Sequence, residues 1–268
     1  MTTNLKLIKK IKIKGNIECL SGMRIGGSVS SLSIGGVDSI IIRNPKDNKP
    51  YIPGSSLKGK LRYLTEISNG TISDSEKSHP IKYGPSDNPE HIAVKLFGAS
   101  TDKKDALKLP SRVIVRDGHI LNEEADFQNA IVPFAELKTE VVIDRITSKA
   151  NPRTIERVPA GAKFSMEILL NIFNFKIENN QVKELDAQKI QEEETTLLSE
   201  LLKSLYLLQN DYLGGNGSRG YGNVQIHIEE LQQISFEQSH IVSQPYSNSN
   251  RDIQDLLEKL NYHPENTV

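Results

Sequence analysis

The sequence predicts an α+β fold in which an antiparallel, ferredoxin-like sheet carries helices on one face. In residues 5–19, apolar side chains alternate with lysines and Asn16, which is the period of a half-buried strand. In residues 192–209, leucines recur at helical spacing and predict a core-facing helix. The predicted elements come in the order strand, helix, strands, helix, strand, which is the order of the ferredoxin-like motif.

The first half of the chain predicts a loop, a strand and a helix after the opening strand. Glycine and serine crowd residues 22–36, a density typical of an exposed loop with close backbone approach. Ile40–Ile42 form a short apolar run and predict a second strand. Ser55 and Ser56 precede a segment whose leucines share one helical face, so these serines predict the cap of a helix over about 57–67.

The second half predicts a hairpin and a closing strand. After a strand at 112–118, the β-rich segments 139–146 and 164–170 flank a polar excursion that resembles a projecting hairpin. Beyond the leucine-rich helix, a glycine-rich run at 214–222 leads into an alternating strand at 223–228.

The domain organisation is predicted to be simple, because 268 residues with 37% hydrophobic side chains can bury one large core. We expect one domain over 1–228 and a C-terminal extension over 229–268. Within the domain we expect an irregular, polar insertion at about 68–95 and the hairpin at about 140–165.

Charge is distributed unevenly along the chain. Residues 1–70 contain twelve Lys or Arg and four Asp or Glu, a net charge of +8, and because the whole chain carries −1 the remainder carries −9. One basic face would suit a polyphosphate partner, because each cation that meets a phosphate releases a condensed counterion. A solvated face without a partner is the alternative that charge alone leaves open.

Few residues suit a self-contained catalytic centre. The single cysteine, Cys19, cannot form an internal disulfide, and its apolar neighbours predict a packed side chain. The six histidines show no metal-ligand spacing, and the run 214–222 lacks the lysine of a nucleotide-binding P-loop. No apolar run reaches the roughly 20 residues that span a bilayer, and the first residues lack the apolar stretch of a signal peptide, so we expect a cytoplasmic protein without a membrane partner.

Two features carry candidate chemistry. In the run 214–222, small residues let backbone N–H groups approach an anion, and Arg219 adds a cation that can grip phosphate; a turn shaped only for folding is the alternative. Asp38 is an acid in the most basic part of the chain, where a carboxylate suits a divalent cation or the deprotonation of an attacking hydroxyl. For Asp38, a turn or capping role is the alternative.

A set of motifs, in order from about residue 8 to residue 228, resembles a known family. The motifs are Gly22-Met23-Arg24-Ile25-Gly26-Gly27, Val37-Asp38-Ser39, Ile52-Pro53-Gly54-Ser55-Ser56-Leu57-Lys58-Gly59-Lys60-Leu61-Arg62, Leu96-Phe97-Gly98, Arg145-Ile146-Thr147 with Ala150-Asn151-Pro152-Arg153, Ile155-Glu156-Arg157-Val158 and Asp211-Tyr212-Leu213-Gly214-Gly215. Together they resemble the backbone RAMP endoribonucleases of type III-A CRISPR (Csm) complexes.

The resemblance implies a modified ferredoxin-like core of the RNA-recognition-motif (RRM) type with a thumb β-hairpin at roughly residues 145–158. Copies would stack along a CRISPR guide RNA beside other Csm subunits, and in antiviral defence the complex would cut guide-paired single-stranded target RNA at regular intervals with Mg²⁺ or another divalent cation. Asp38 matches the catalytic acid, as a metal ligand or as the base. The positions that match RNA-binding residues are Arg24, Gly26, Gly27, Ser55, Ser56, Lys58, Lys60, Arg62, Arg145, Arg153, Arg157, Gly214, Gly215 and Arg219.

Two other functions stay open on the sequence. A purely structural guide-binding subunit would make Asp38 incidental. A stand-alone enzyme that processes CRISPR transcripts would have to supply its own acid and base, and the chain has no histidine near Arg24 or the C-terminal glycine loop.

Overall fold

In a computed structural model, residues 6–27, 39–74, 83–99, 109–128, 130, 132–178, 181–236, 241–245 and 252–261 are described. The centre is a five-stranded antiparallel sheet in the order β13-β12-β1-β9-β5. Its strands are β1 (Leu7–Cys19), β5 (Val113–Val115), β9 (Lys163–Phe173), β12 (Val224–Phe236) and β13 (Ile241–Pro245). The predicted α+β class with an antiparallel sheet is confirmed.

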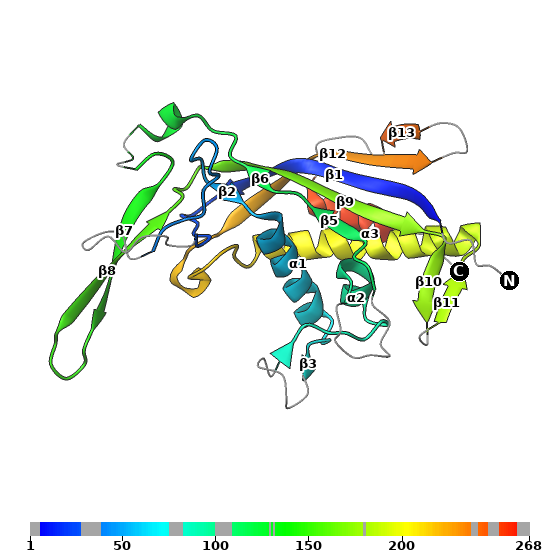
Figure 1. Ribbon diagram of the computed structural model, residues 1–268, viewed down its shortest axis with the longest axis horizontal. Coiled ribbons are helices and arrows are strands. Elements are labelled where there is room, and N and C mark those ends of the chain that lie inside the picture. Colours follow the sequence, from blue (N-terminus) through cyan, green and yellow to red (C-terminus); the bar gives the residue numbers. More distant parts are fainter. Residues whose placement is uncertain are drawn as a thin grey trace.

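Helices lie on one face of this sheet (Figure 1). The long helix α3 (Ala187–Gln209) contacts β9 and β12, and α1 (Gly54–Ser68) packs against α3. The short helix α2 (Ile92–Phe97) contacts both of them, and α4 (Ile253–Asn261) packs on α3. In the part of the chain that the structure describes, no helix is both long enough and apolar enough to cross a membrane.

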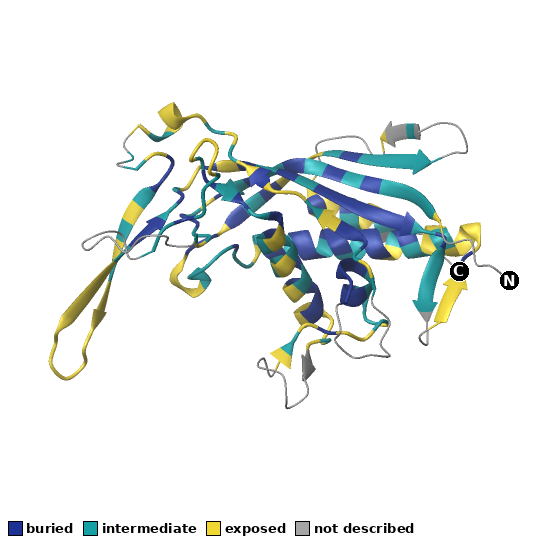
Figure 2. Ribbon diagram, in the orientation of Figure 1, coloured by how far each residue is buried: buried dark blue, intermediate teal, exposed yellow. Residues whose placement is uncertain are grey.

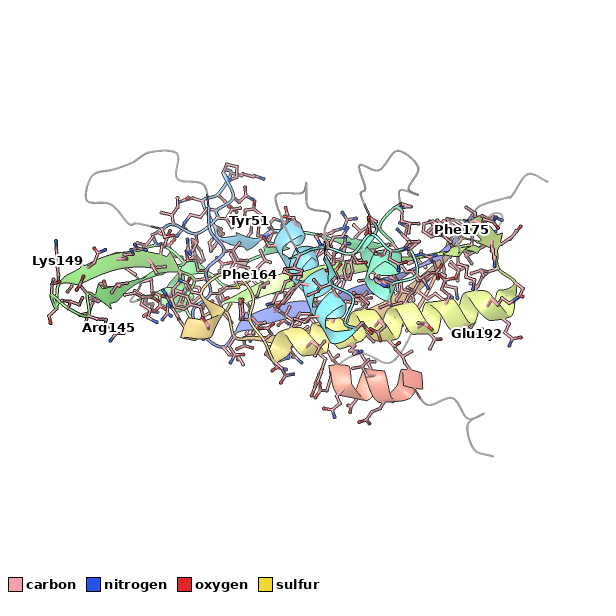
Figure 3. All side chains as sticks on the ribbon, turned by 90° about the horizontal axis from the view of Figure 1, so that it is seen from below. Tyr51, Arg145, Lys149, Phe164, Phe175 and Glu192 are labelled. Carbon is pink, nitrogen blue, oxygen red and sulfur yellow. The ribbon has the colours of Figure 1, made fainter. Side chains whose placement is uncertain are left out.

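Short strand pairs and two 3-10 turns complete the structure. The pairs are β2 (Tyr51–Ile52) with β6 (Gly118–His119), β3 (Ser73–Asp74) with β4 (Tyr83–Gly84), and β10 (Phe175–Glu178) with β11 (Gln181–Glu184); the turns are η1 (Glu124–Phe127) and η2 (Gly217–Arg219). A longer hairpin of β7 (Glu136–Ile143) and β8 (Ala150–Arg157) projects from one end of the molecule. Arg145 and Lys149 mark its tip, and Phe175 and Glu192 lie at the opposite end (Figure 3).

The alternating pattern of β1 divides the sheet into two faces. Ile11, Ile13 and Ile17 are at most 1% exposed and face the helices, while the intervening lysines lie on the other face. The leucines of α3 complete the core, because Leu197, Leu198, Leu201, Leu202, Leu205 and Leu208 are all fully buried. Figure 2 shows the buried stripe through β1, β9 and α3 and the exposed outer half of the β7–β8 hairpin. The predicted first strand and leucine-rich helix are confirmed.

Two predicted elements differ from the structure. Ile40–Ile42 do not form a strand; residues 39–43 make isolated bridges with Ile155, Gly26 and Pro50 instead. The hairpin is not confined to the polar excursion after residue 146: residues 139–143 form its first strand with 136–138 and pair with 150–154, while residues 144–146 lie in its turn and 164–170 belong to the central sheet as part of β9. A hairpin that projects from the body buries little of either face, so the polar β8, with Pro152 in it, gave no alternating signal.

The start of α1 also differs from the prediction that Ser55 and Ser56 cap it. The helix begins at Gly54 after Pro53, and no side chain of the N-cap residue caps it. The Gly54 amide instead donates to Oδ1 of Asp117, 2.7 Å away in the turn between β5 and β6. A Cβ at residue 54 would lie 2.3 Å from the carbonyl oxygen of Val115, so this close approach requires glycine. The carboxylate of Asp117, which is distant in the sequence, therefore accepts from the first helical amide in place of the expected serine.

Replacing Asp117 with alanine is expected to lower the free energy of unfolding by about 0.5–2 kcal/mol, the usual effect of losing a carboxylate that accepts from the first helical amides. Asp117→Asn keeps an acceptor oxygen and is expected to lose less. Urea unfolding of both variants measures the difference. Equal losses for the two variants would contradict the capping role.

Candidate functional site

Strand register gathers the candidate residues at one end of the sheet. At the end of β1, Cys19 pairs with Val224 at the start of β12, and Glu18 pairs with Lys163 at the start of β9. The segments next to these positions are the loop after β1, the glycine loop before β12 and the base of the β7–β8 hairpin. All three therefore meet at the same end, as the chain path in Figure 1 shows.

The two glycine-rich loops are joined through their backbones. Gly215 N donates to Arg24 O at 2.8 Å, and Gly222 N donates to Gly22 O at 3.0 Å. Gly214 has a φ of +87°, and a Cβ there would lie 2.3 Å from Arg24 O. Only glycine tolerates both the positive φ and this contact, so the loop sequence serves close packing of the two backbones.

These loops and α1 line a groove of about 610 Å³. Its lining residues are Arg24, Ile25, Gly26, Ser56, Gly59, Lys60, Tyr63, Tyr212, Leu213, Gly214 and Gly215. Six of the predicted RNA-binding positions therefore lie on one surface: Arg24, Gly26, Ser56, Lys60, Gly214 and Gly215. In the sequence these segments are separated by tens of residues or more, so it is the fold that brings them together.

Lys60 is the lysine of this groove. Its Nζ lies 2.9 Å from Oδ2 of Asp211, 3.8 Å from the ring centroid of Tyr212 and 5.3 Å from that of Tyr63. The aromatic faces and the carboxylate hold the ammonium group in place over the groove. Tyr63 and Tyr212 were not among the predicted site residues, although Tyr63 follows Lys60 by three positions and so shares its side of a helix.

Lys58 and Arg62 lie on another side of α1. Lys58 Nζ donates to Ser111 Oγ at 2.8 Å, and burial, followed by the neighbouring Arg62, lowers the pKa of Lys58. Arg62 donates to the carbonyl oxygens of Gly98 and Ser86 at 2.9 and 2.7 Å, and pairs with Glu66 at 2.9 Å. Residues four apart share a helix face, whereas a residue two positions away points elsewhere, so the three cations do not form one row. Ser55 is exposed beside the groove and is not in its lining.

The predicted arginines of the second half divide between the tip and the base of the hairpin. Arg145 and Arg153 are exposed on its outer half. Arg157 Nε pairs with Glu136 at 2.6 Å, and its guanidinium lies 4.8 Å from the ring centroid of Tyr221. The two acids nearest to Arg157 in the motifs have other partners: Asp144 accepts from the Ile146 and Thr147 amides in the tip, and Glu156 pairs with Arg43.

Arg219 links the C-terminal glycine loop to the hairpin. Its Nη1 lies 2.8 Å from Oε2 of Glu140 on β7. The Tyr221 hydroxyl, and then Arg219, hold the pKa of Glu140 below its ordinary value. Burial, and then the Glu140 carboxylate, raise the pKa of Tyr221 to about 12. Arg219 thus contacts the hairpin and is not among the residues that line the groove.

Gly27 and Ser39 border the segment 28–38 that the structure does not describe. Asp38 lies outside the described residues, and its neighbour Ser39 lies inside them. Ser39 Oγ accepts a hydrogen bond from Arg24 Nη2, and Ser39 O accepts from Glu156 N of β8 at 2.9 Å. Gly27 N donates to Ile40 O at 3.1 Å. The residue after Asp38 therefore sits between the groove and the base of the hairpin.

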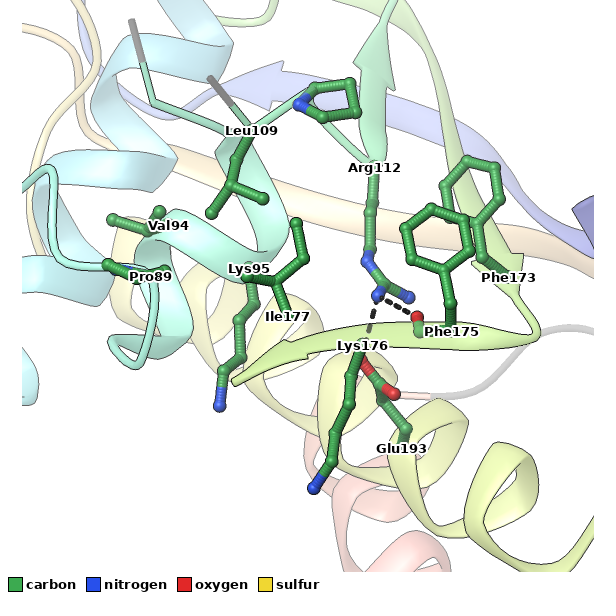
Figure 4. A pocket seen from close by; sticks show the side chains of 11 residues that line it. Pro89, Val94, Lys95, Leu109, Arg112, Phe173, Phe175, Lys176, Ile177 and Glu193 are labelled. Carbon is green, nitrogen blue, oxygen red and sulfur yellow. Dashed lines mark hydrogen bonds and ion pairs between the residues drawn. The ribbon is translucent and has the colours of Figure 1, made fainter. Parts of the chain in front are cut away.

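A second hollow, at the far end of the molecule, surrounds an ion pair with a structural role. Arg112 donates from Nη2 to Phe175 O at 3.0 Å and pairs with Glu193 at 2.9 Å (Figure 4). The hollow has a volume of about 30 Å³, which is room for one or two waters. Desolvation lowers the pKa of Arg112 and raises that of Glu193, as expected for a buried pair that joins the residue before β5 to α3.

Comparisons with known proteins identify the class. A model of the RAMP superfamily matches residues 16–225. A protein of Methanocaldococcus jannaschii named CRISPR system Cms endoribonuclease Csm3 is 38% identical over 231 residues, which cover 85% of this chain and 83% of that protein. The protein of the same name from Streptococcus thermophilus is 38% identical over 216 residues, with 80% and 86% covered.

The chain belongs to the RAMP superfamily. Within it, the chain is a member of the Csm3 family of CRISPR endoribonucleases. The Csm3–Csm4 subcomplex of a type III-A CRISPR–Cas interference complex contains a chain that is 25% identical, with a TM-score of 0.51 and 96% and 97% of the two chains covered. The crystal structure of Methanopyrus kandleri Csm3, 19% identical with a TM-score of 0.59 over 96% and 97% of the chains, shares the fold.

Lys60→Ala is expected to weaken the binding of single-stranded RNA and to reduce the slope of log affinity against log salt by about 0.7, the value for one phosphate contact to a single strand. Titrations at several salt concentrations measure both quantities. Lys46→Ala, in an exposed turn of the same basic stretch, is the matched control and should leave the slope unchanged. The same change of slope in both variants would remove Lys60 from the interface.

Proposed function

We propose that this chain is the guide-RNA-binding backbone subunit of a type III-A CRISPR effector complex that cleaves guide-paired target RNA at regular intervals. The observation that carries the proposal is the groove in which Arg24 and Lys60 stand beside the backbone of two interlocked glycine loops. Cations beside small residues, which leave room for close approach, suit the phosphates of an extended strand. The endoribonuclease activity in the names of the relatives supports the same assignment.

The fold suits this role as a modified ferredoxin-like, RRM-type core. Helix α1 lies between β1 and β5 in the chain, α3 lies between β9 and β12, and these four strands stand in the order β12-β1-β9-β5. The β7–β8 hairpin is inserted between β5 and β9 and would be the thumb. Strand β12 continues beyond residue 228 to Phe236. The elements that follow it, β13 and α4, add to the core.

The partners follow from this architecture. Guide RNA would occupy the groove with its phosphates, target RNA would pair with the guide, and neighbouring copies of the chain would extend the groove along the strand. A Csm4 subunit is the neighbour in the subcomplex to which this chain is similar, which supports other Csm subunits as partners. The cytoplasm is the expected compartment.

Asp38 is the proposed catalytic residue. RNA carries its own nucleophile, the 2′-hydroxyl, and a splayed nucleotide reaches in-line geometry more easily than a stacked one. One carboxylate beside the scissile linkage is then enough to accept the hydroxyl proton or to hold a divalent cation. Support comes from Ser39, whose side chain bonds Arg24 of the groove and whose carbonyl oxygen bonds the hairpin.

A divalent cation would have to draw ligands from the RNA. Among the described residues, no group of three His, Cys, Asp or Glu side chains could hold a metal ion, so those residues supply no self-contained site. Mg²⁺ usually binds through one or two carboxylates together with phosphate oxygens and waters, and it would neutralise charge on the phosphate. Asp38 is the proposed protein ligand.

In the reconstituted complex, Asp38→Ala is expected to abolish target cleavage while guide and target binding persist. Gel analysis of labelled target RNA measures cleavage, and filter binding measures affinity. Asp47→Ala is the control, since Asp47 is an exposed turn residue in the same basic region whose carboxylate accepts from the nearby Lys49 amide at 3.1 Å. Cleavage at regular intervals by Asp38→Ala would leave a structural, guide-binding role instead.

Chelation by EDTA is expected to stop target cleavage and added Mg²⁺ to restore it, with the affinity for target RNA measured in parallel. The affinity is expected to survive chelation, because the phosphate contacts come from the protein. Cleavage that continues at full rate in EDTA would contradict the metal requirement. Cutting of repeat RNA by the isolated chain under those conditions would indicate transcript processing.

A further inference from the structure

A buried glutamate on the hairpin holds the segment that follows Asp38. The side chain of Glu156 is on β8, yet the residue is only 5% exposed. Its Oε2 accepts from Ile41 N at 3.0 Å, and its Oε1 accepts from Arg43 Nη2 at 2.7 Å. One carboxylate of the hairpin therefore binds two residues of the segment 39–43.

The opposite side of this segment is bonded to the loop that lines the groove. Ile42 N donates to Ile25 O at 2.9 Å, and Arg24 donates to the Ser39 hydroxyl. Segment 39–43 is thus fixed between the groove on one side and the hairpin on the other. Ser39, the first residue of this segment, directly follows Asp38 in the sequence.

Arg43 extends the attachment to two further segments. Besides Glu156, it donates from Nη1 to Asn48 O at 2.9 Å and from Nη2 to Pro133 O at 3.0 Å. Pro133 precedes β7, so the guanidinium joins both strands of the hairpin base to the segment. The side chains of Arg43 and Glu156 are 14% and 6% exposed, and removing one partner would leave the other charge buried and unpaired.

The Arg43–Glu156 pair is better explained by positioning than by stability. Burying two charges costs desolvation energy that their attraction roughly offsets, so apolar side chains of similar size would stabilise the fold as well or better. Directional bonds from one carboxylate to a backbone amide and to a guanidinium fix position more narrowly than apolar contact does.

We propose that Glu156 is a positioning residue for RNA cleavage, which sets the segment after Asp38 against the hairpin through its bonds to Ile41 and Arg43. This inference rests on the proposed function. It assigns to the hairpin a second task beside contact with RNA, namely holding the cleavage loop in register with the linkage to be cut.

The test uses Glu156→Gln in the reconstituted complex, with single-turnover cleavage and target affinity measured separately. Glutamine keeps an acceptor for Ile41 N and loses the charge that pairs with Arg43. The cleavage rate constant is expected to fall roughly tenfold to a hundredfold, the usual cost of misplacing a reacting group by about 1 Å, while target affinity and cut positions stay unchanged. Glu167→Gln, which breaks a 2.6 Å pair with Arg116 outside the groove, should cut at the wild-type rate.

A double variant, Glu156→Gln with Arg43→Gln, leaves no buried charge unpaired and carries the test if a single variant fails to assemble. Because the two side chains act as one unit, the double variant is expected to cut no more slowly than the slower single variant, yet below the wild-type rate. A wild-type rate constant in the double variant, with Asp38→Ala inactive, would overturn the positioning role alone. Full activity of Asp38→Ala would overturn the proposed catalyst and the positioning role together.

Discussion

The register of β1 against β12 determines which loops meet, and one bulge sets that register. Lys14 pairs with Glu230 and Gly15 with Ile228, so β12 contributes one unpaired residue, Glu229. A Cβ on Gly15 would lie 1.9 Å from His227 O, which shows how closely the strands approach at the bulge. Without the bulge, every side chain of β12 beyond it would change face. On the loop side of the bulge, Cys19 pairs with Val224, and this register brings the glycine loop before β12 to Arg24, where Gly215 N donates to Arg24 O.

The hydrophobic periodicity of the sequence was enough to predict the main strand and the main helix of the core. The alternation in β1 and the leucine stripe of α3 were legible because each element buries one face against the core. Even the bulge leaves a trace, since the buried residues Val224, Ile226 and Ile228 are followed by Leu231 and not by residue 230. Periodicity could not reveal β8, because its outer half packs against no core, nor the cap of α1, because the acceptor, Asp117, lies 63 positions away.

Site prediction succeeded for residue types and failed for partners. Motif matching selected Arg24 and Lys60, which line the groove, but treated Lys58 and Arg62 as their equals although helix geometry directs those two to Ser111 and to the carbonyl oxygens of Gly98 and Ser86. Glu156 stood inside a matched motif without a role, because its partners Ile41 and Arg43 are more than a hundred residues away. Catalysis by Asp38 stays a prediction from the family, as do its metal and its RNA contacts.

The groove cations are already engaged before any ligand arrives. Lys60 pairs with Asp211, so an entering phosphate has to compete with a carboxylate for the same ammonium group. The pair with Asp211 also gives the Lys60 side chain a defined position in the free protein. It also makes affinity depend on several weak contacts along a strand, which favours a long ligand over a single phosphate.

The outer half of the hairpin has a further consequence for the free protein. Val141, Val142 and Ile143 are 52%, 55% and 55% exposed at consecutive positions, so both faces of the ribbon present apolar side chains to water. A two-stranded ribbon is marginally stable alone, and its open edges invite pairing with foreign strands. In the free chain, this exposed apolar ribbon is therefore where aggregation is expected to begin.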